Sequence, residues 1–168
     1  MGRGTRPAKQ SRTNIAWRLA IALPLGLAAT GLAAQERISR WEATVTGTGA
    51  VAADCQNCGE DIAVWMECEN GVDQFHVSFR GVPTDQGRNG DLVSVLVTVD
   101  GNTESRVGRL SFFGPPGYAP VVDIGASETL MDRMASGRVL TVRSTGSERV
   151  VPLDGSFIAI ATLRQTCG

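Results

Sequence analysis

The four cysteines are the feature that most constrains how this chain can fold. Cys55, Cys58 and Cys68 lie close together, and Cys167 is the penultimate residue of the 168. In an exported domain, an even number of cysteines predicts a disulfide framework, here with three possible pairings. A bridge to Cys167 would bring the C-terminal end of the sequence back to the early region. We favour Cys68–Cys167 with Cys55–Cys58, and Cys58–Cys68 with Cys55–Cys167 remains open.

The disulfide prediction depends on export from the cytosol, and the first residues indicate export. Every charge among residues 1–33 is positive, and residues 19–34 are uncharged and end in small side chains. This pattern is typical of a secretory signal peptide. The apolar run spans about 16 residues, whereas a membrane-spanning helix needs roughly 20. We therefore expect cleavage after Ala33 or Ala34, which makes residues 1–33 a signal peptide and 34–168 a single periplasmic or secreted domain without a stable membrane anchor.

The charge of the expected mature domain excludes two classes of partner. The whole chain has 16 basic and 17 acidic residues. Removing the five cations of the signal peptide leaves 11 basic against 17 acidic residues, a net charge near −6. Nucleic-acid binding needs a basic face that releases counterions, so we expect none. Adsorption to anionic membranes is disfavoured for the same reason.

Alternating apolar residues and turn signals predict a mainly β fold. Apolar side chains alternate in 75–79 and 92–99, and Asn70-Gly71 and Asp100-Gly101 are strong hairpin signals. We expect about seven strands in an antiparallel β-sandwich or bent double sheet. Proline-rich 114–120 is expected to be an exposed loop, because proline disfavours a central strand. The expected strands are 40–51 (ended by Gly47–Gly49), 62–66 continuing to Cys68, 75–79, 92–99, 103–113, 139–142 and 149–153.

Two short helices are expected beside this sheet. Ser127 is the candidate N-cap of the first, which runs to about Ser136 with Leu130, Met131 and Met134 on one face and Gly137 as its stop. Ser156 is the candidate N-cap of a C-terminal helix. Its expected apolar face comprises Phe157, Ile160 and Ala161, broadened by Ile158 and Leu163.

The C-terminal stretch resembles a known family. Residues 137–142, a turn, residues 151–156 with Leu153-Asp-Gly155, residues 157–163 and Cys167 are similar to the invasion-associated locus B family of periplasmic and secreted proteins. The upstream pair Trp65 and Cys68 fits the same pattern, whereas the extra CxxC and the Pro-Pro loop depart from it. The resemblance implies a β-sandwich-like envelope protein, without known catalytic residues, in a family linked to host-cell contact.

No catalytic, cofactor or metal motif emerges from the sequence. The lone histidine, His76, is expected to be a surface-facing strand residue, and no G-x-S-x-G nucleophile motif is present. Cys55 and Cys58 form a CxxC, but without the βαβ context of a redox site or the second half of a zinc site. Glu67 and Glu69 are expected to share a strand face, as part of a solvated acidic surface that could bind a cation.

The remaining candidate is an aromatic binding loop. It comprises Phe113, Pro115, Pro116 and Tyr118, with Phe112 just before it. A proline-flanked tyrosine loses little entropy on binding, and loops on a rigid sheet often carry recognition. We therefore expect a non-enzymatic, cofactor-free envelope protein that binds an unknown protein or envelope component. The alternative is a small periplasmic hydrolase or CxxC redox protein.

Overall fold

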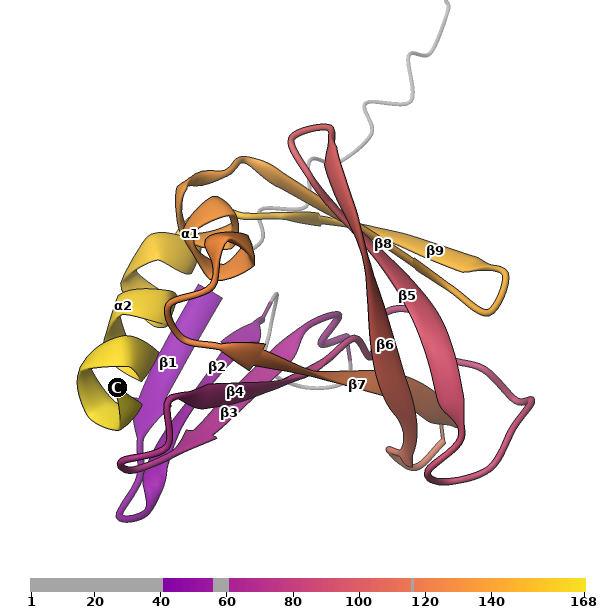
Figure 1. Cartoon of the computed structure of the whole chain (residues 1–168), viewed down its shortest axis with the longest axis horizontal. Coiled ribbons are helices and arrows are strands. Elements are labelled where there is room, and N and C mark those ends of the chain that lie inside the picture. Colours follow the sequence, from indigo (N-terminus) through magenta and orange to yellow (C-terminus); the bar gives the residue numbers. More distant parts are fainter. Residues whose placement is uncertain (1–40, 56–60, 116) are drawn as a thin grey trace, which may run out of the picture. The chain divides into compact units, whose positions relative to one another are not determined.

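One antiparallel sheet forms most of the structure. The computed structural model describes residues 41–55, 61–115 and 117–168 (Figure 1). Across these residues, nine strands lie in the order β1-β2-β3-β4-β7-β6-β5-β8-β9, and all neighbours are antiparallel. The mainly β fold class predicted from the sequence is confirmed. The strands are β1 (Trp41–Val45), β2 (Gly49–Asp54), β3 (Trp65–Glu69), β4 (Gln74–Ser78), β5 (Leu92–Val99), β6 (Asn102–Phe112), β7 (Tyr118–Gly125), β8 (Val139–Ser144) and β9 (Ser147–Pro152).

The sheet bends so strongly that its two edge strands approach each other. The indole Nε1 of Trp41 on β1 donates a hydrogen bond to the carbonyl oxygen of Pro152 on β9 (3.0 Å). Further along β9, the Arg149 guanidinium lies 3.2 Å from the Asp61 carboxylate, and Ser147 Oγ donates to the carbonyl oxygen of Pro83 (3.3 Å). In the described sheet, β1 and β9 are the two edge strands and form no backbone pairing with each other. The side-chain contacts near these edges hinder their pairing with strands of other chains.

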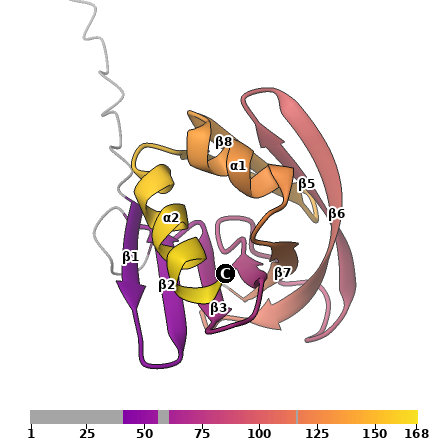
Figure 2. The same cartoon turned by 60° about the vertical axis from the view of Figure 1, so that its left-hand side comes forward.

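Two helices lie together at one end of the bent sheet. They are α1 (Thr129–Ser136) and α2 (Ser156–Cys167), and α2 lies across β1 and β2 (Figures 1 and 2). Leu130, Met131 and Met134 of α1 are fully buried, as the sequence predicted. The connection 79–91 and the β8–β9 turn lie at the other end, on the right in Figure 1. At the helical end, side chains of the helices pack into the core. The opposite end is made of loops.

The inner face of the sheet carries the core. On β5, Val95, Val97 and Val99 point inward and are buried, while Leu92 and Leu96 face solvent. The predicted alternation of this strand is therefore confirmed, with the bounds 92–99. The turn that follows is also confirmed, because Asp100 and Gly101 both have the positive φ that a type I′ hairpin turn needs (46° and 85°). Phe75 and Val77 on β4 complete the same layer.

The Cys68–Cys167 disulfide joins β3 to α2. The S–S distance is 2.06 Å, and both residues are buried in the core. This is the bridge favoured from the sequence. Cys55 is also disulfide-bonded, and its expected partner Cys58 lies outside the described residues. The expected signal peptide and its cleavage point lie outside them as well.

The predicted strand 40–51 is wrong, because the structure divides this region between two strands. Gly49 does not end a strand but starts β2, after a tight turn in which the Thr46 N–H donates to the Gly49 carbonyl oxygen. A Cβ on Gly49 would lie 1.8 Å from the Cys68 carbonyl oxygen. Only glycine permits this close approach of β2 to β3. The next strand is shifted as well, since β3 begins at Trp65 rather than Ile62.

The predicted loop 114–120 is wrong at its C-terminal end. β7 begins at Tyr118, contains Pro120, and is a central strand between β4 and β6. Leu110 lies opposite Pro120, but its N–H donates to the backbone carbonyl oxygen of Asp91 and not to β7. On the other side β4 has ended at Ser78, and the Phe79 N–H donates to the Pro120 carbonyl oxygen. The missing proline N–H therefore breaks no ladder bond, and this is why a central strand tolerates it.

Both predicted serine caps are wrong. The N-cap of α1 is Glu128, one residue after Ser127, and its Oε1 accepts a hydrogen bond from the Gly125 N–H (2.8 Å). Ser156 lies inside α2 rather than at its cap, and its buried Oγ is 2.7 Å from the carbonyl oxygens of Met134 and Leu153. The serine therefore fixes α2 against α1 instead of capping its own helix.

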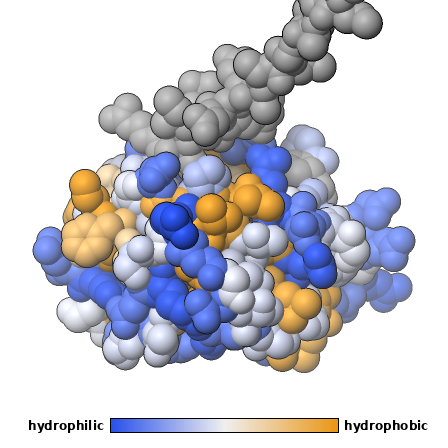
Figure 3. Space-filling model, turned by 90° about the horizontal axis from the view of Figure 1, so that it is seen from above, coloured by the Kyte–Doolittle hydropathy of each residue, from blue (hydrophilic) through white to orange (hydrophobic). Residues whose placement is uncertain are grey.

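The apolar face predicted for α2 is only partly correct. Ile160 and Leu163 are buried, together with Ala159 and Cys167. Phe157 and Ile158, however, are 66% and 71% exposed. Figure 3 views the molecule from above and shows hydrophobic residues in small groups separated by hydrophilic ones. The disulfide and the buried Ser156 fix which side of α2 faces the core. Phe157 and Ile158 therefore face outward.

Candidate functional site

An arginine held between two aromatic rings is the most distinctive side-chain arrangement on the outer face of the sheet. The guanidinium carbon of Arg80 lies 4.6 Å from the ring centroid of Trp65 and 4.5 Å from that of Phe113. Such distances allow cation–π attraction and stacking. We call Trp65, Arg80 and Phe113 the arginine–aromatic stack.

The bent sheet brings the three residues of the stack together from distant parts of the sequence. Trp65 begins β3 and pairs with Ser78, Arg80 comes two residues after that serine, and Phe113 directly follows β6. β3 is the neighbour of β4 on one side, and β6 lies beyond β7 on the other. The bend of the sheet therefore places both rings against the same guanidinium.

The electrostatic setting of Arg80 is unusual for an arginine at the surface. It is half-buried, and its Nε is buried without a hydrogen-bond partner. Desolvation lowers the pKa of Arg80, partly offset by the negative charge of Glu67, which raises it. The Glu67 carboxylate itself accepts a hydrogen bond from Trp65 Nε1 (3.2 Å). Arg80 thus stays cationic, as arginine does in proteins, but is poorly hydrated.

A second aromatic contact lies at the same end of the molecule. The rings of Phe112 and Tyr118 are 5.4 Å apart and inclined at 60°, within the range favoured by aromatic pairs. Phe112 is 62% exposed. The backbone of Tyr118 pairs with Thr84, which fixes the start of β7 against the 79–91 connection. We call Phe112 and Tyr118 the aromatic pair.

The residues predicted for the binding loop fall into different places. Phe113 belongs to the arginine–aromatic stack and Tyr118 to the aromatic pair, whereas Pro115 is exposed between them and Pro116 lies outside the described residues. Trp65 and Arg80 were not among the predicted site residues. Arg80 gives no local signal, because nothing in its sequence neighbourhood distinguishes it from other arginines.

His76 forms a hydrogen-bonded pair with Asp123 on the same outer face. His76 Nδ1 lies 2.6 Å from Asp123 Oδ1, and the two side chains are 43% and 53% exposed. Such a pair can fix the tautomer and orientation of an imidazole, as in Ser-His-Asp sites. Within the part of the chain that the structure describes, no serine or cysteine makes a hydrogen bond to His76. Among the described residues, the pair therefore has no hydrogen-bonded nucleophile of the kind that hydrolysis would use.

The acidic residues near the disulfide lie on the solvent face of the sheet. Glu67 and Glu69 are both exposed and share one face of β3, as expected. Among residues 41–55, 61–115 and 117–168, no three His, Cys, Asp or Glu side chains are placed together as potential metal ligands. Their exposure is that of the solvated acidic face expected from the sequence.

A surface cavity of about 630 Å³ lies beside the 79–91 connection. Its lining mixes hydroxyl, amide and carboxylate groups with apolar side chains, and the Asp91 carboxylate already accepts a hydrogen bond from the Arg88 N–H (2.8 Å). The cavity adds a concave surface at the loop end. Its described lining does not place a nucleophile beside a base. Its lining residues are Thr84, Gln86, Gly87, Asp91, Leu92, Val93, Leu110 and Thr145.

Comparison with known proteins gives a fold neighbour. No protein-family model and no curated protein sequence matches the chain. Among solved structures, the fold is similar to that of invasion associated protein B from Bartonella henselae, with a TM-score of 0.51 and 13% sequence identity. The match covers 76% of this chain and 93% of that one. In the described residues, neither helix combines the length and apolarity that a membrane span requires.

Proposed function

We propose that this chain is an exported, non-enzymatic protein of the cell envelope that binds another protein or an envelope component through its loop end. The arginine–aromatic stack and the aromatic pair form the binding surface. The observation that carries the proposal is the stack itself, because three segments distant in sequence hold one poorly hydrated arginine between two rings. Tryptophan, tyrosine and arginine are the residues that most often dominate binding energy at interfaces.

Two further observations support the envelope part of the proposal. The sequence starts with the basic, apolar and small-residue segments of a signal peptide. The fold is similar to that of a Bartonella protein whose name associates it with invasion. A host-contact role would follow if the chain shares that protein's function as well as its fold.

Site-specific photocrosslinking in the intact cell tests the binding surface. A photoreactive phenylalanine analogue is placed at Phe112 in one variant and at Phe157 in a matched control. Both native side chains are phenylalanines and similarly exposed, 62% and 66%, but Phe157 lies on α2, away from the proposed surface. We expect a discrete covalent adduct from position 112 that is absent from position 157. Adducts at both positions, or only at 157, would contradict the proposed surface.

Export is tested separately on the same cells. Mass spectrometry of the chain recovered from the periplasm or medium should give an N-terminus at Ala34 or Gln35 and no free thiol. An intact N-terminus on a cytosolic product with four titratable thiols would contradict the envelope proposal without bearing on the photocrosslinking result.

A further inference from the structure

Arg80 has a complete set of hydrogen-bond donors that the protein does not use. A guanidinium carries five N–H donors in a planar fork. Arg80 donates none of them to any residue within 41–55, 61–115 or 117–168, and its contacts there are with the rings of Trp65 and Phe113. Most other half-buried arginines of the sheet and helices are paired, as Arg106 is with Glu104 and Glu128. The two rings therefore hold the Arg80 side chain in place, while its N–H donors have no acceptor among the described residues.

The stacked geometry determines which part of Arg80 is available. Both rings lie against the guanidinium and restrict its rotation. Nε is buried, whereas the terminal Nη nitrogens are not among the buried unpaired atoms, so their N–H groups are the donors open to a ligand. A planar fork of this kind matches a carboxylate, which accepts two parallel N–H···O bonds. Because the side chain is already held, little of its rotational entropy remains to be lost when a ligand binds.

We infer that Arg80 is a carboxylate-binding site that receives an Asp or Glu side chain of a protein partner. This inference rests on the proposed function, since it names the chemistry that the binding surface recognises. The stack supplies a single cation, and Glu67 already places a negative charge beside it. A singly charged carboxylate is therefore repelled less by Glu67 than a more highly charged anion would be. A doubly charged phosphate would leave excess negative charge next to Glu67, on a domain that is itself acidic.

The test uses the oxidised mature protein recovered from the periplasm and two small probes. N-acetyl-aspartate N-methylamide carries the carboxylate, and N-acetyl-asparagine N-methylamide is its neutral isostere. NMR follows the Arg80 Nε–H and the Trp65 indole N–H during titration. We expect saturable shifts of both signals with the aspartate probe, with a dissociation constant in the millimolar range typical of a single contact, and none with the asparagine probe.

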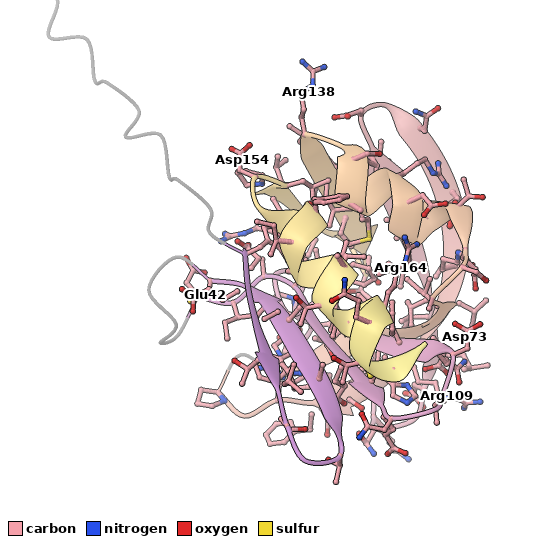
Figure 4. All side chains as sticks on the ribbon, turned by 90° about the vertical axis from the view of Figure 1, so that its left-hand side faces the viewer. Glu42, Asp73, Arg109, Arg138, Asp154 and Arg164 are labelled. Atoms are coloured by element: carbon pink, nitrogen blue, oxygen red, sulfur yellow. A yellow bond between two sulfur atoms is a disulfide. The ribbon has the colours of Figure 1, made fainter. Side chains whose placement is uncertain are left out.

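Two variants separate the fork from simple charge. Arg80→Lys keeps the positive charge but loses the planar donor pair, so binding of the aspartate probe should weaken roughly tenfold, equivalent to about 1.4 kcal/mol. Arg109→Lys is the matched control, because Arg109 is exposed on the same sheet and has no aromatic stack (labelled in Figure 4). The control should bind the probe as the wild type does.

Three results would overturn the inference. They are equal shifts with both probes, an unchanged affinity in Arg80→Lys, and tighter binding of inorganic phosphate than of the aspartate probe. The proposed function fails separately. If the photocrosslink from position 112 forms but the aspartate probe does not bind Arg80, the surface binds a partner by other contacts. If the probe binds and the photocrosslink is absent, the carboxylate site exists without the proposed partner surface.

Discussion

The Cys68–Cys167 disulfide can be removed without touching the proposed binding surface, because it fastens α2 to β3 at the helical end. The double variant Cys68→Ala/Cys167→Ala changes no residue of the proposed surface and removes two buried sulfur atoms. Cys68 Sγ lies 3.7 Å from the carbonyl oxygen of Ala50 and 3.8 Å from that of Leu163, so the bridge lies between the sheet and the helix. Its loss should therefore weaken the docking of α2 in particular.

The expected magnitude follows from the length of chain that the bridge closes. The two cysteines are 99 residues apart. On the chain-entropy model, a crosslink closing a loop of roughly 100 residues stabilises the folded state by about 4.7 kcal/mol at 25 °C. Total stabilities of small domains are about 5–15 kcal/mol, so a loss of this size would leave the variant close to unfolding at 37 °C. The unfolded chain also becomes more expanded, so the denaturant m-value should rise.

Urea unfolding followed by tryptophan fluorescence measures the effect. Trp41 is buried, lies next to Gly155 at the N-terminus of α2, and donates to Pro152, so its emission reports on the docking of that helix. Amide hydrogen exchange should accelerate first in α2. The control is Cys55→Ala/Cys58→Ala. If those two cysteines pair as the sequence predicts, the short loop they close makes a smaller contribution. A loss below about 1 kcal/mol in Cys68→Ala/Cys167→Ala, or a larger loss in the control, would refute the entropic reasoning.

Two further changes test local features of the fold. The Gly125 N–H and Arg106 lower the pKa of Glu128, so the stability that this carboxylate adds is present above the ordinary glutamate range and is lost as the pH falls below about 4. Glu128→Gln should therefore have a lower free energy of unfolding than wild type at pH 7, by less than about 1 kcal/mol because the side chain is partly exposed. The two unfolding curves should converge in acid. A difference that persists at pH 3 would contradict this. Thr145 has a φ of 49° before Gly146 in the β8–β9 turn, a conformation unfavourable for a β-branched residue. Thr145→Asn should raise the free energy of unfolding by about 1 kcal/mol, measured by thermal or urea unfolding, and a decrease would show that the Thr145 side chain makes a compensating contact.

Patterns that act over a few residues predicted much of the fold correctly. The valines of β5, the Asp100-Gly101 turn and the buried face of α1 depend on period-two or helical spacing and on the backbone preference of glycine. The same reasoning missed β2, because Gly49 suggested the end of a strand. It also missed the start of β7, because proline in a central strand is acceptable only where the neighbouring strand has already ended.

The candidate site shows the same division more sharply. Phe113 and Tyr118 stand out in the sequence as aromatic residues around prolines, and both lie at the loop end. Arg80 does not stand out, because its importance comes from Trp65, fifteen residues earlier in the sequence, and from Phe113, which directly follows β6, two strands away from β4 in the sheet.

By itself the sequence determined where the chain alternates, where it turns, and that a bridge to Cys167 would draw the C-terminal helix back to the early strands. Only the tertiary structure decided that α2 turns Phe157 and Ile158 outward, that Pro120 lies in a central strand, and that Arg80 lies between two rings. The physical reason is range. Alternation and turn preference are fixed by neighbouring residues, whereas the burial of a helix face and the surroundings of a guanidinium depend on strands brought together by the bend of the whole sheet.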